Sequence, residues 1–95
     1  MFIVLLRFSE QKSRAGAFME SHNAWIKQGL EDGVFLVVGS LQPGLGGGIV
    51  AHKTTIKDLQ ARVDRDPFVD ENVVTAEILE IAPSQTDERL AFLLD

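Results

Sequence analysis

The residues of this chain best suited to chemistry are His22 and Asp66. Histidine side chains titrate near neutral pH, so an imidazole can accept and return protons under ordinary conditions. His22 shares one face of a predicted helix with apolar side chains three or four positions away: Phe18 and either Trp25 or Ile26. If the fold brings Asp66 to this imidazole, the carboxylate would fix the tautomer and stabilise the charged ring, giving an acid/base pair.

Both residues also have ordinary structural explanations. A single histidine on an apolar helix face is more often a core residue with a satisfied ring than a catalyst. Asp66 precedes Pro67, and an aspartate before proline is common at turns, where its carboxylate accepts hydrogen bonds from nearby backbone N–H groups. Because the two residues lie far apart in the chain, their spacing leaves both interpretations open.

Arg7 is a third candidate. It ends the first predicted strand on the same face as Ile3 and Leu5, where a guanidinium is unexpected. Such a group is suited to holding an anionic substrate through two parallel hydrogen bonds. Pairing with Glu77 or Glu80 on the last predicted strand explains the same residue structurally, and this is the more frequent outcome.

Further binding residues are predicted around a glycine in the second strand. A glycine within a strand lets a ligand approach the backbone, so we expect Gly39 and Ser40 to bind a polar group of a substrate. Trp25 and Phe68 are expected in the core or in the wall of the same pocket. The glycine-rich stretch 44–48 lacks a GxGxxG or GKS/GKT pattern and precedes a predicted strand, which indicates a hairpin turn rather than a phosphate-binding loop.

Composition narrows the class of protein. Ninety-five residues, 45% apolar and 24% charged, suit one small globular domain, and the net charge of −5 argues against binding to nucleic acid or to anionic membranes. The chain has no cysteine, no HxH or HExxH motif and no serine-nucleophile signature, so we predict neither metal nor cofactor. No targeting signal is visible, and we expect a cytoplasmic protein.

The predicted elements follow the order βαββαβ. Strands are expected at 2–8, 34–41, 47–54 and 73–82, and helices at 12–32 and from Thr55 to a stop at Pro67. This order is typical of a ferredoxin-like α+β domain with an antiparallel sheet, spanning residues 1–83. Residues 84–95 are predicted to be a C-terminal extension with a short helix, capped within Ser84–Asp87.

The predicted sheet is apolar on both faces, although two helices can cover only one of them. In the first strand Phe2 and Val4 alternate with Ile3 and Leu5, and residues 34–38 show the same double pattern. Leaving the second face in water would cost several kcal/mol at roughly 25 cal/mol per Å². We therefore expect a homodimer or higher homo-oligomer packed sheet to sheet as a dimeric α/β barrel. The alternative is that the C-terminal extension folds over its own sheet.

The order and spacing of several motifs over residues 1–83 resemble the YciI-related (YCII) family. They are the opening Phe2–Phe8 strand, His22-x-x-Trp25-Ile26, Gly33, Gly39-Ser40-Leu41, Gly46-Gly47-Gly48 and Asp66-Pro67-Phe68. The resemblance implies a ferredoxin-like subunit of a dimeric α/β barrel, similar to muconolactone isomerase. It also implies a pocket with a histidine–aspartate pair at His22 and Asp66. One branch of that family dehydrochlorinates chlorinated hydroxyhydroquinones.

Two functions follow as expectations. In the first, the protein is a small cofactor-independent enzyme in which His22 acts as general base or acid and Asp66 orients it. Its substrate would be a small aromatic or enol-type molecule undergoing elimination, such as dehydrochlorination, or isomerisation, because no nucleophile or metal site is evident. In the second, it is a non-catalytic ligand-binding or accessory dimer in which the pair is structural.

Overall fold

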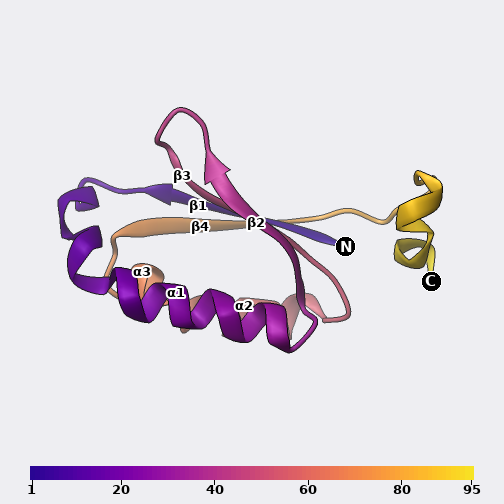
Figure 1. Ribbon diagram of the computed structural model, residues 1–95, viewed down its shortest axis with the longest axis horizontal. Helices are drawn as coiled ribbons and strands as arrows, with labels where there is room; N and C mark the ends of the chain where they lie inside the picture. Colours follow the sequence, from indigo (N-terminus) through magenta and orange to yellow (C-terminus); the bar gives the residue numbers. More distant parts are fainter.

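A four-stranded antiparallel sheet forms the framework of the protein, and the computed structural model describes all 95 residues. Its strands are β1 (Phe2–Phe8), β2 (Phe35–Leu41), β3 (Gly46–Ala51) and β4 (Val74–Glu80), arranged in the order β2-β3-β1-β4. Helices α1 (Ala15–Glu31) and α2 (Ile56–Asp64) and the single turn α3 (Pro67–Asp70) cover one face (Figure 1). This arrangement is the predicted ferredoxin-like α+β fold.

The core lies between the sheet and the helices. Alternate residues of the central strand β1 point into it, and Val4 is completely buried there. Leu59 and Val63 of α2 meet these side chains from the other side and are also fully buried. Each such apolar side chain contributes about 1.5–3 kcal/mol to folding.

The predicted first helix is divided in two. Lys12–Arg14 form a 3₁₀ turn (η1), and the α-helix proper runs from Ala15 to Glu31. Gly33 follows with a φ of +75°, a left-handed conformation that glycine adopts without strain and that commonly ends helices. The predicted stop signal at Gly33 is therefore confirmed.

Other boundaries also differ from the prediction, and β4 ends at Glu80 rather than at residue 82. β3 ends at Ala51 rather than at residue 54, because the chain turns at Lys53, which has a φ of +53°. Helix α2 ends at Asp64, before Pro67, and Pro67 does not merely stop a helix: it opens α3 at the first helical position. Proline suits that position because its fixed φ is already helical and no N–H is needed there.

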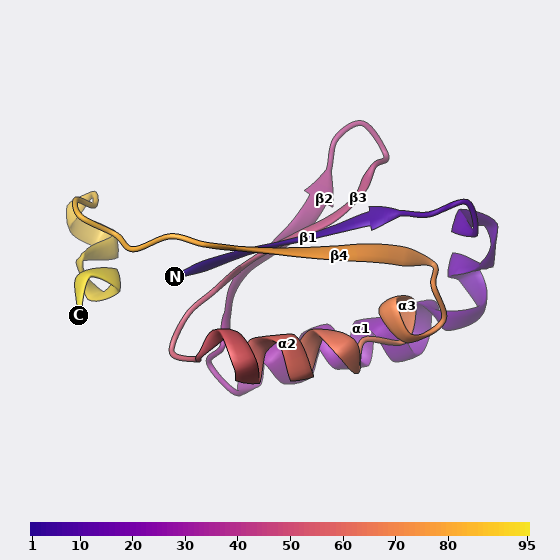
Figure 2. The ribbon, with the colours of Figure 1, turned by 180° about the vertical axis from the view of Figure 1, so that it is seen from behind.

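The face of the sheet away from the helices is open and apolar. Val37 and Leu79 on that face are 59% and 43% exposed, and Ile3, Leu5 and Val50 share it. The C-terminal segment leaves the middle of this face uncovered, because it runs out beyond one end of the sheet (Figures 1 and 2). The sheet-to-sheet homodimer that would cover the face stays a prediction.

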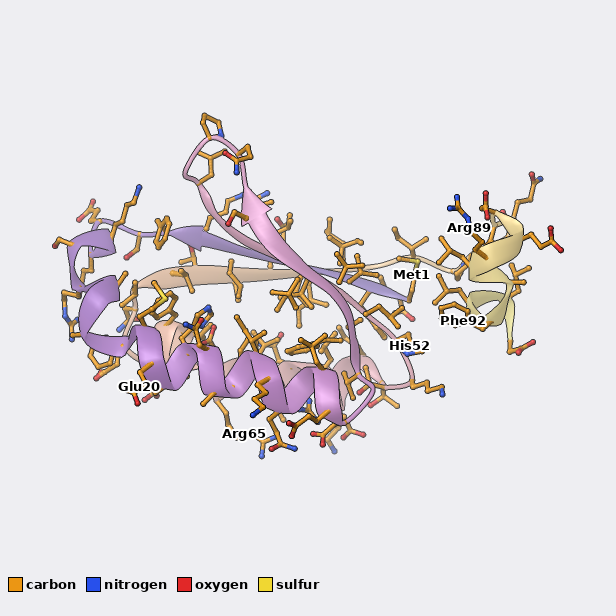
Figure 3. All side chains as sticks on the ribbon, in the orientation of Figure 1. Met1, Glu20, His52, Arg65, Arg89 and Phe92 are labelled. Carbon is orange, nitrogen blue, oxygen red and sulfur yellow. The ribbon has the colours of Figure 1, made fainter.

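The C-terminal segment ends in two short 3₁₀ turns at Glu88–Leu94 (η2) rather than in an α-helix. Asp87 caps them by accepting a hydrogen bond from the backbone N–H of Arg89 at 2.9 Å. Phe92 packs edge-on against the His52 ring with centroids 5.6 Å apart (Figure 3). No helix in the protein is long and apolar enough to cross a membrane.

Candidate functional site

The structure brings His22 and Asp66 together. Nδ1 of His22 lies 2.7 Å from Oδ1 of Asp66, across the packed boundary between α1 and α3. The Asp66 side chain is completely buried, and that of His22 is only 12% exposed. A hydrogen bond of this length between an imidazole and a carboxylate is in the range of charge-assisted pairs.

Asp66 is held in place by its own position in the chain. It is the N-cap residue of α3, with extended backbone angles (φ −61°, ψ 123°), and its Oδ1 accepts the backbone N–H of Phe68 at 3.0 Å. The ordinary turn interpretation of Asp66 is therefore correct in its geometry, but the same oxygen also meets His22. One carboxylate serves both the cap and the imidazole.

The plane of the His22 ring is set by an aromatic neighbour. The Phe68 ring lies parallel to it, with centroids 3.9 Å apart and an angle of 4° between the planes. Phe68 is itself 4% exposed and belongs to the buried core. Hydrogen bonding at Nδ1 and stacking on one face together leave the imidazole a single orientation.

The pairing also determines which ring nitrogen is available for chemistry. When Asp66 is ionised its carboxylate only accepts hydrogen bonds, and Nδ1 of His22 is then the donor of this hydrogen bond. Nε2 has no hydrogen-bond partner in the chain and is not sealed in the interior, whereas Oδ2 of Asp66 is buried without a partner. Nε2 is thus the ring nitrogen left available for proton exchange.

His22 lines a cavity of about 280 Å³ between α1 and the sheet. Its walls are mostly apolar and include Phe8, Ile26 and Phe68. Polar groups come from Asn23 on α1 and Ser40 on β2. A mainly apolar hollow with a few polar groups and one titratable residue is the usual composition of a small-molecule site.

The predicted binding residues divide into two groups. Gly39, Ser40 and Phe68 line the cavity with His22. Trp25 lies outside the lining, where its indole N–H donates to the backbone carbonyl of Arg62 at 2.9 Å and joins α1 to α2. These positions give Trp25 a packing role behind the imidazole, with ring centroids 6.0 Å apart.

Arg7 also lies outside the cavity. Its guanidinium forms an ion pair with Glu77 at 2.7 Å on the open face of the sheet, and both side chains are about half exposed. The pairing with a glutamate of β4 is the structural alternative stated for this residue. An exposed pair of this kind contributes about 0–1 kcal/mol to stability.

Three residues of α1 line the cavity although the sequence did not predict it: Met19, Asn23 and Ile26. They follow one another at intervals of three or four, so they form a stripe beside the one that contains Phe18 and Trp25. His22 sits between the two stripes, which is why it contacts both the core and the cavity. The spacing of three and four residues along the helix therefore indicates that these side chains share a face.

The protein has no cluster of three or more histidine, cysteine, aspartate or glutamate side chains arranged to hold a metal ion. The pair at His22 and Asp66 stands apart from other side chains of these types.

Comparison with known proteins gives a structural relative but no sequence relative. No protein-family profile and no characterised protein sequence matches the chain. The fold is similar to that of 5-chloro-2-hydroxyhydroquinone dehydrochlorinase from Burkholderia phenoliruptrix AC1100, solved in complex with 2,5-dihydroxybenzoquinone. The TM-score is 0.69 at 12% identity, covering 85% of this chain and 93% of the other. At this identity the similarity establishes the fold alone.

Proposed function

We propose that the protein is a small cofactor-independent enzyme that uses His22 and Asp66 for acid/base chemistry on a small planar substrate. The observation that carries the proposal is the free Nε2 of an imidazole whose other nitrogen is hydrogen-bonded to a buried carboxylate. This arrangement holds a proton acceptor in one tautomer and one orientation at the wall of a cavity.

The chemistry follows from the atoms present. Nε2 of His22 accepts a proton from a hydroxyl or an activated C–H of the substrate, and Asp66 stabilises the positive charge that the ring acquires. In an isomerisation the ring returns the proton to another substrate atom. In an elimination the electron pair released by deprotonation expels a leaving group such as chloride, and the proton passes to solvent.

The cavity favours a ring-shaped substrate. Its apolar walls suit the faces of an unsaturated ring, and Asn23 and Ser40 can hydrogen-bond to oxygen substituents at the rim. The dehydrochlorinase with the similar fold acts on a chlorinated hydroxyhydroquinone and was solved with a dihydroxybenzoquinone. We infer a substrate of related chemistry, that is, a hydroxylated ring that loses HCl or shifts a proton.

The setting of this activity is part of the proposal. We infer membership of the YciI-related family, a homodimer that buries the apolar outer face of the sheet, and a cytoplasmic location. Supporting the homodimer are the exposed side chains of Val37 and Leu79, which a second copy would cover.

A second function is favoured by the burial of the pair. His22 is 12% exposed and packed against Phe68, so the pair also fits a structural role in a non-catalytic ligand-binding or accessory dimer. In that case His22→Ala would lower the thermal unfolding midpoint and remove no activity.

The test compares His22→Ala with His52→Ala on a panel of chlorinated hydroxyhydroquinones and lactones. His52 is the other histidine of the chain and packs against Phe92, away from the cavity. We expect His22→Ala to lower turnover by roughly 10²–10⁴-fold and His52→Ala to leave it unchanged. Equal turnover in wild type and His22→Ala would exclude the catalytic role.

An NMR titration of His22 gives an independent measurement. A ring that exchanges its Nε2 proton with solvent across neutral pH, while Nδ1 stays bonded to Asp66, agrees with catalysis. An imidazole locked in one protonation state across the range agrees with the structural role.

A further inference from the structure

The glycine at position 47 faces the cavity. Gly47 of β3 pairs directly with Leu6 of β1 and with Ser40 of β2. Directly opposed residues of antiparallel strands project to the same face, and Leu6 is a buried core residue on the helix side. A side chain at position 47 would therefore point from the sheet towards α1, into the space lined by His22.

Neither backbone conformation nor packing requires glycine at this position. Gly46 has a φ of +136°, and a Cβ there would lie 1.9 Å from the carbonyl oxygen of Leu6, so its glycine is obligatory. Gly47 has no such positive φ, and a Cβ there would meet only the Gly39 carbonyl oxygen at 3.5 Å, an ordinary contact. The lack of a side chain at Gly47 leaves space inside the cavity.

The cavity volume limits what this space can hold. Benzene occupies engineered apolar cavities of about 150 Å³, so the 280 Å³ found here accommodates one six-membered ring with its substituents. A flat ring also matches the β2–β3 backbone, which at Gly47 presents no side chain.

We propose that Gly47 is the specificity-determining floor of the cavity, and that the cavity takes a flat hydroxylated ring lying against this strand. The ring edge then faces Nε2 of His22, while Asn23 and Ser40 are within the same lining to hold its oxygen substituents. The part of this inference that concerns turnover rests on the proposed function, whereas the part that concerns binding does not.

The experiment measures the binding of 2,5-dihydroxybenzoquinone by isothermal titration calorimetry. The proteins are wild type, Gly47→Ala, Gly47→Val and Gly16→Ala. Gly16 is the matched control, because a Cβ there meets nothing within 4 Å and the residue lies outside the cavity lining.

We expect wild type and Gly16→Ala to bind 2,5-dihydroxybenzoquinone equally. Gly47→Ala should weaken this binding by about tenfold and Gly47→Val by more, since one misplaced methyl group in a pocket changes affinity by roughly 10–200-fold. Unchanged affinity in Gly47→Ala, or no binding of this probe to wild type, would overturn the proposal.

The outcome is separable from that of the proposed function. His22→Ala tests turnover, whereas Gly47→Ala tests the affinity for the ring. A non-catalytic binding protein would therefore still bind the probe more weakly when Gly47 is replaced by alanine. If Gly47→Val does not fold, Gly47→Ala decides the question, because its added methyl group meets only an ordinary contact. Thermal unfolding of each variant verifies that the fold is retained.

Discussion

Replacing Asp66 by alanine and by asparagine separates what this side chain does for folding from what its charge does for the imidazole. In the native protein Oδ1 of Asp66 accepts two hydrogen bonds, from Nδ1 of His22 at 2.7 Å and from the backbone N–H of Phe68 at 3.0 Å. Alanine removes both. Asparagine retains a carbonyl oxygen at the same position and removes only the charge.

The contacts of Asp66 give the free energy of unfolding that Asp66→Ala should lose. Loss of an N-cap costs about 0.5–2 kcal/mol. The His22 ring, 12% exposed, is left with an unsatisfied nitrogen, which costs about 1–3 kcal/mol. The total is about 1.5–5 kcal/mol. At about 4–8 °C per kcal/mol for a domain of this size, it lowers the thermal unfolding midpoint by roughly 6–40 °C.

We expect Asp66→Asn to lower the free energy of unfolding by less than half as much as Asp66→Ala. Its amide nitrogen takes the place of Oδ2, an atom that already lacks a partner in the buried site, so one unsatisfied group replaces another. Activity behaves differently, because a neutral amide cannot stabilise the imidazolium. We expect turnover in Asp66→Asn to fall by roughly 10²–10⁴-fold although the fold is retained.

The assay is urea and thermal unfolding of both variants, followed by turnover on the same substrate panel. The reasoning is refuted if Asp66→Ala unfolds within about 0.5 kcal/mol of wild type, because the capping and pairing contacts would then carry no stability. It is refuted in its chemical part if Asp66→Asn turns substrate over at the wild-type rate.

Two further predictions concern residues outside the cavity. Gly29→Ala should destabilise the protein by about 1–3 kcal/mol although alanine favours helices, because the new Cβ would lie 2.2 Å from the Phe35 ring; an unchanged urea midpoint would contradict this. Hydrogen bonds from Gln28 and Arg62 hold the pKa of Asp32 below its ordinary value of 3.8. A lowered folded-state pKa stabilises the fold at pH values above the unfolded pKa, and this contribution is lost as pH falls through the folded-state pKa. The stability difference between wild type and Asp32→Asn should therefore be fully present well above pH 3.8 and shrink as pH falls below that value. A difference that does not change with pH would disprove the linkage.

The fold was predictable because its signals are local. The apolar run of β1, the stop at Gly33 and the cap at Thr55 each act within a few residues, and Thr55 does accept the N–H of Asp58 at 3.1 Å. Boundaries that depend on tertiary contacts were less accurate. β3 ends at Ala51 because the chain turns at Lys53. Lys53 adopts a positive φ although it is not a glycine, and the sequence does not predict this conformation.

The site was predictable only in part, because it is assembled from distant segments. Residue type singled out His22 and Asp66, but their contact depends on how α1 packs against α3. Arg7 shows the opposite case: its type suggested anion binding, and the sheet register placed it opposite Thr75 and beside the Glu77 carboxylate instead. Asn23 was missed because an asparagine on an exposed helix position is unremarkable until the cavity beside it is known.

The tripeptide Asp66-Pro67-Phe68 supplies, within three residues, everything that fixes the imidazole from one side. Pro67 sets the backbone at the first helical position, Asp66 caps the turn and accepts the ring N–H, and Phe68 both donates to that carboxylate and stacks on the ring. The orientation of the His22 ring therefore depends on the four-residue turn α3 staying folded, rather than on a long helix. A change that loosens α3 should misplace the imidazole even when His22 and Asp66 are both intact, and this makes the turn as much a part of the candidate site as the two residues proposed to perform its chemistry.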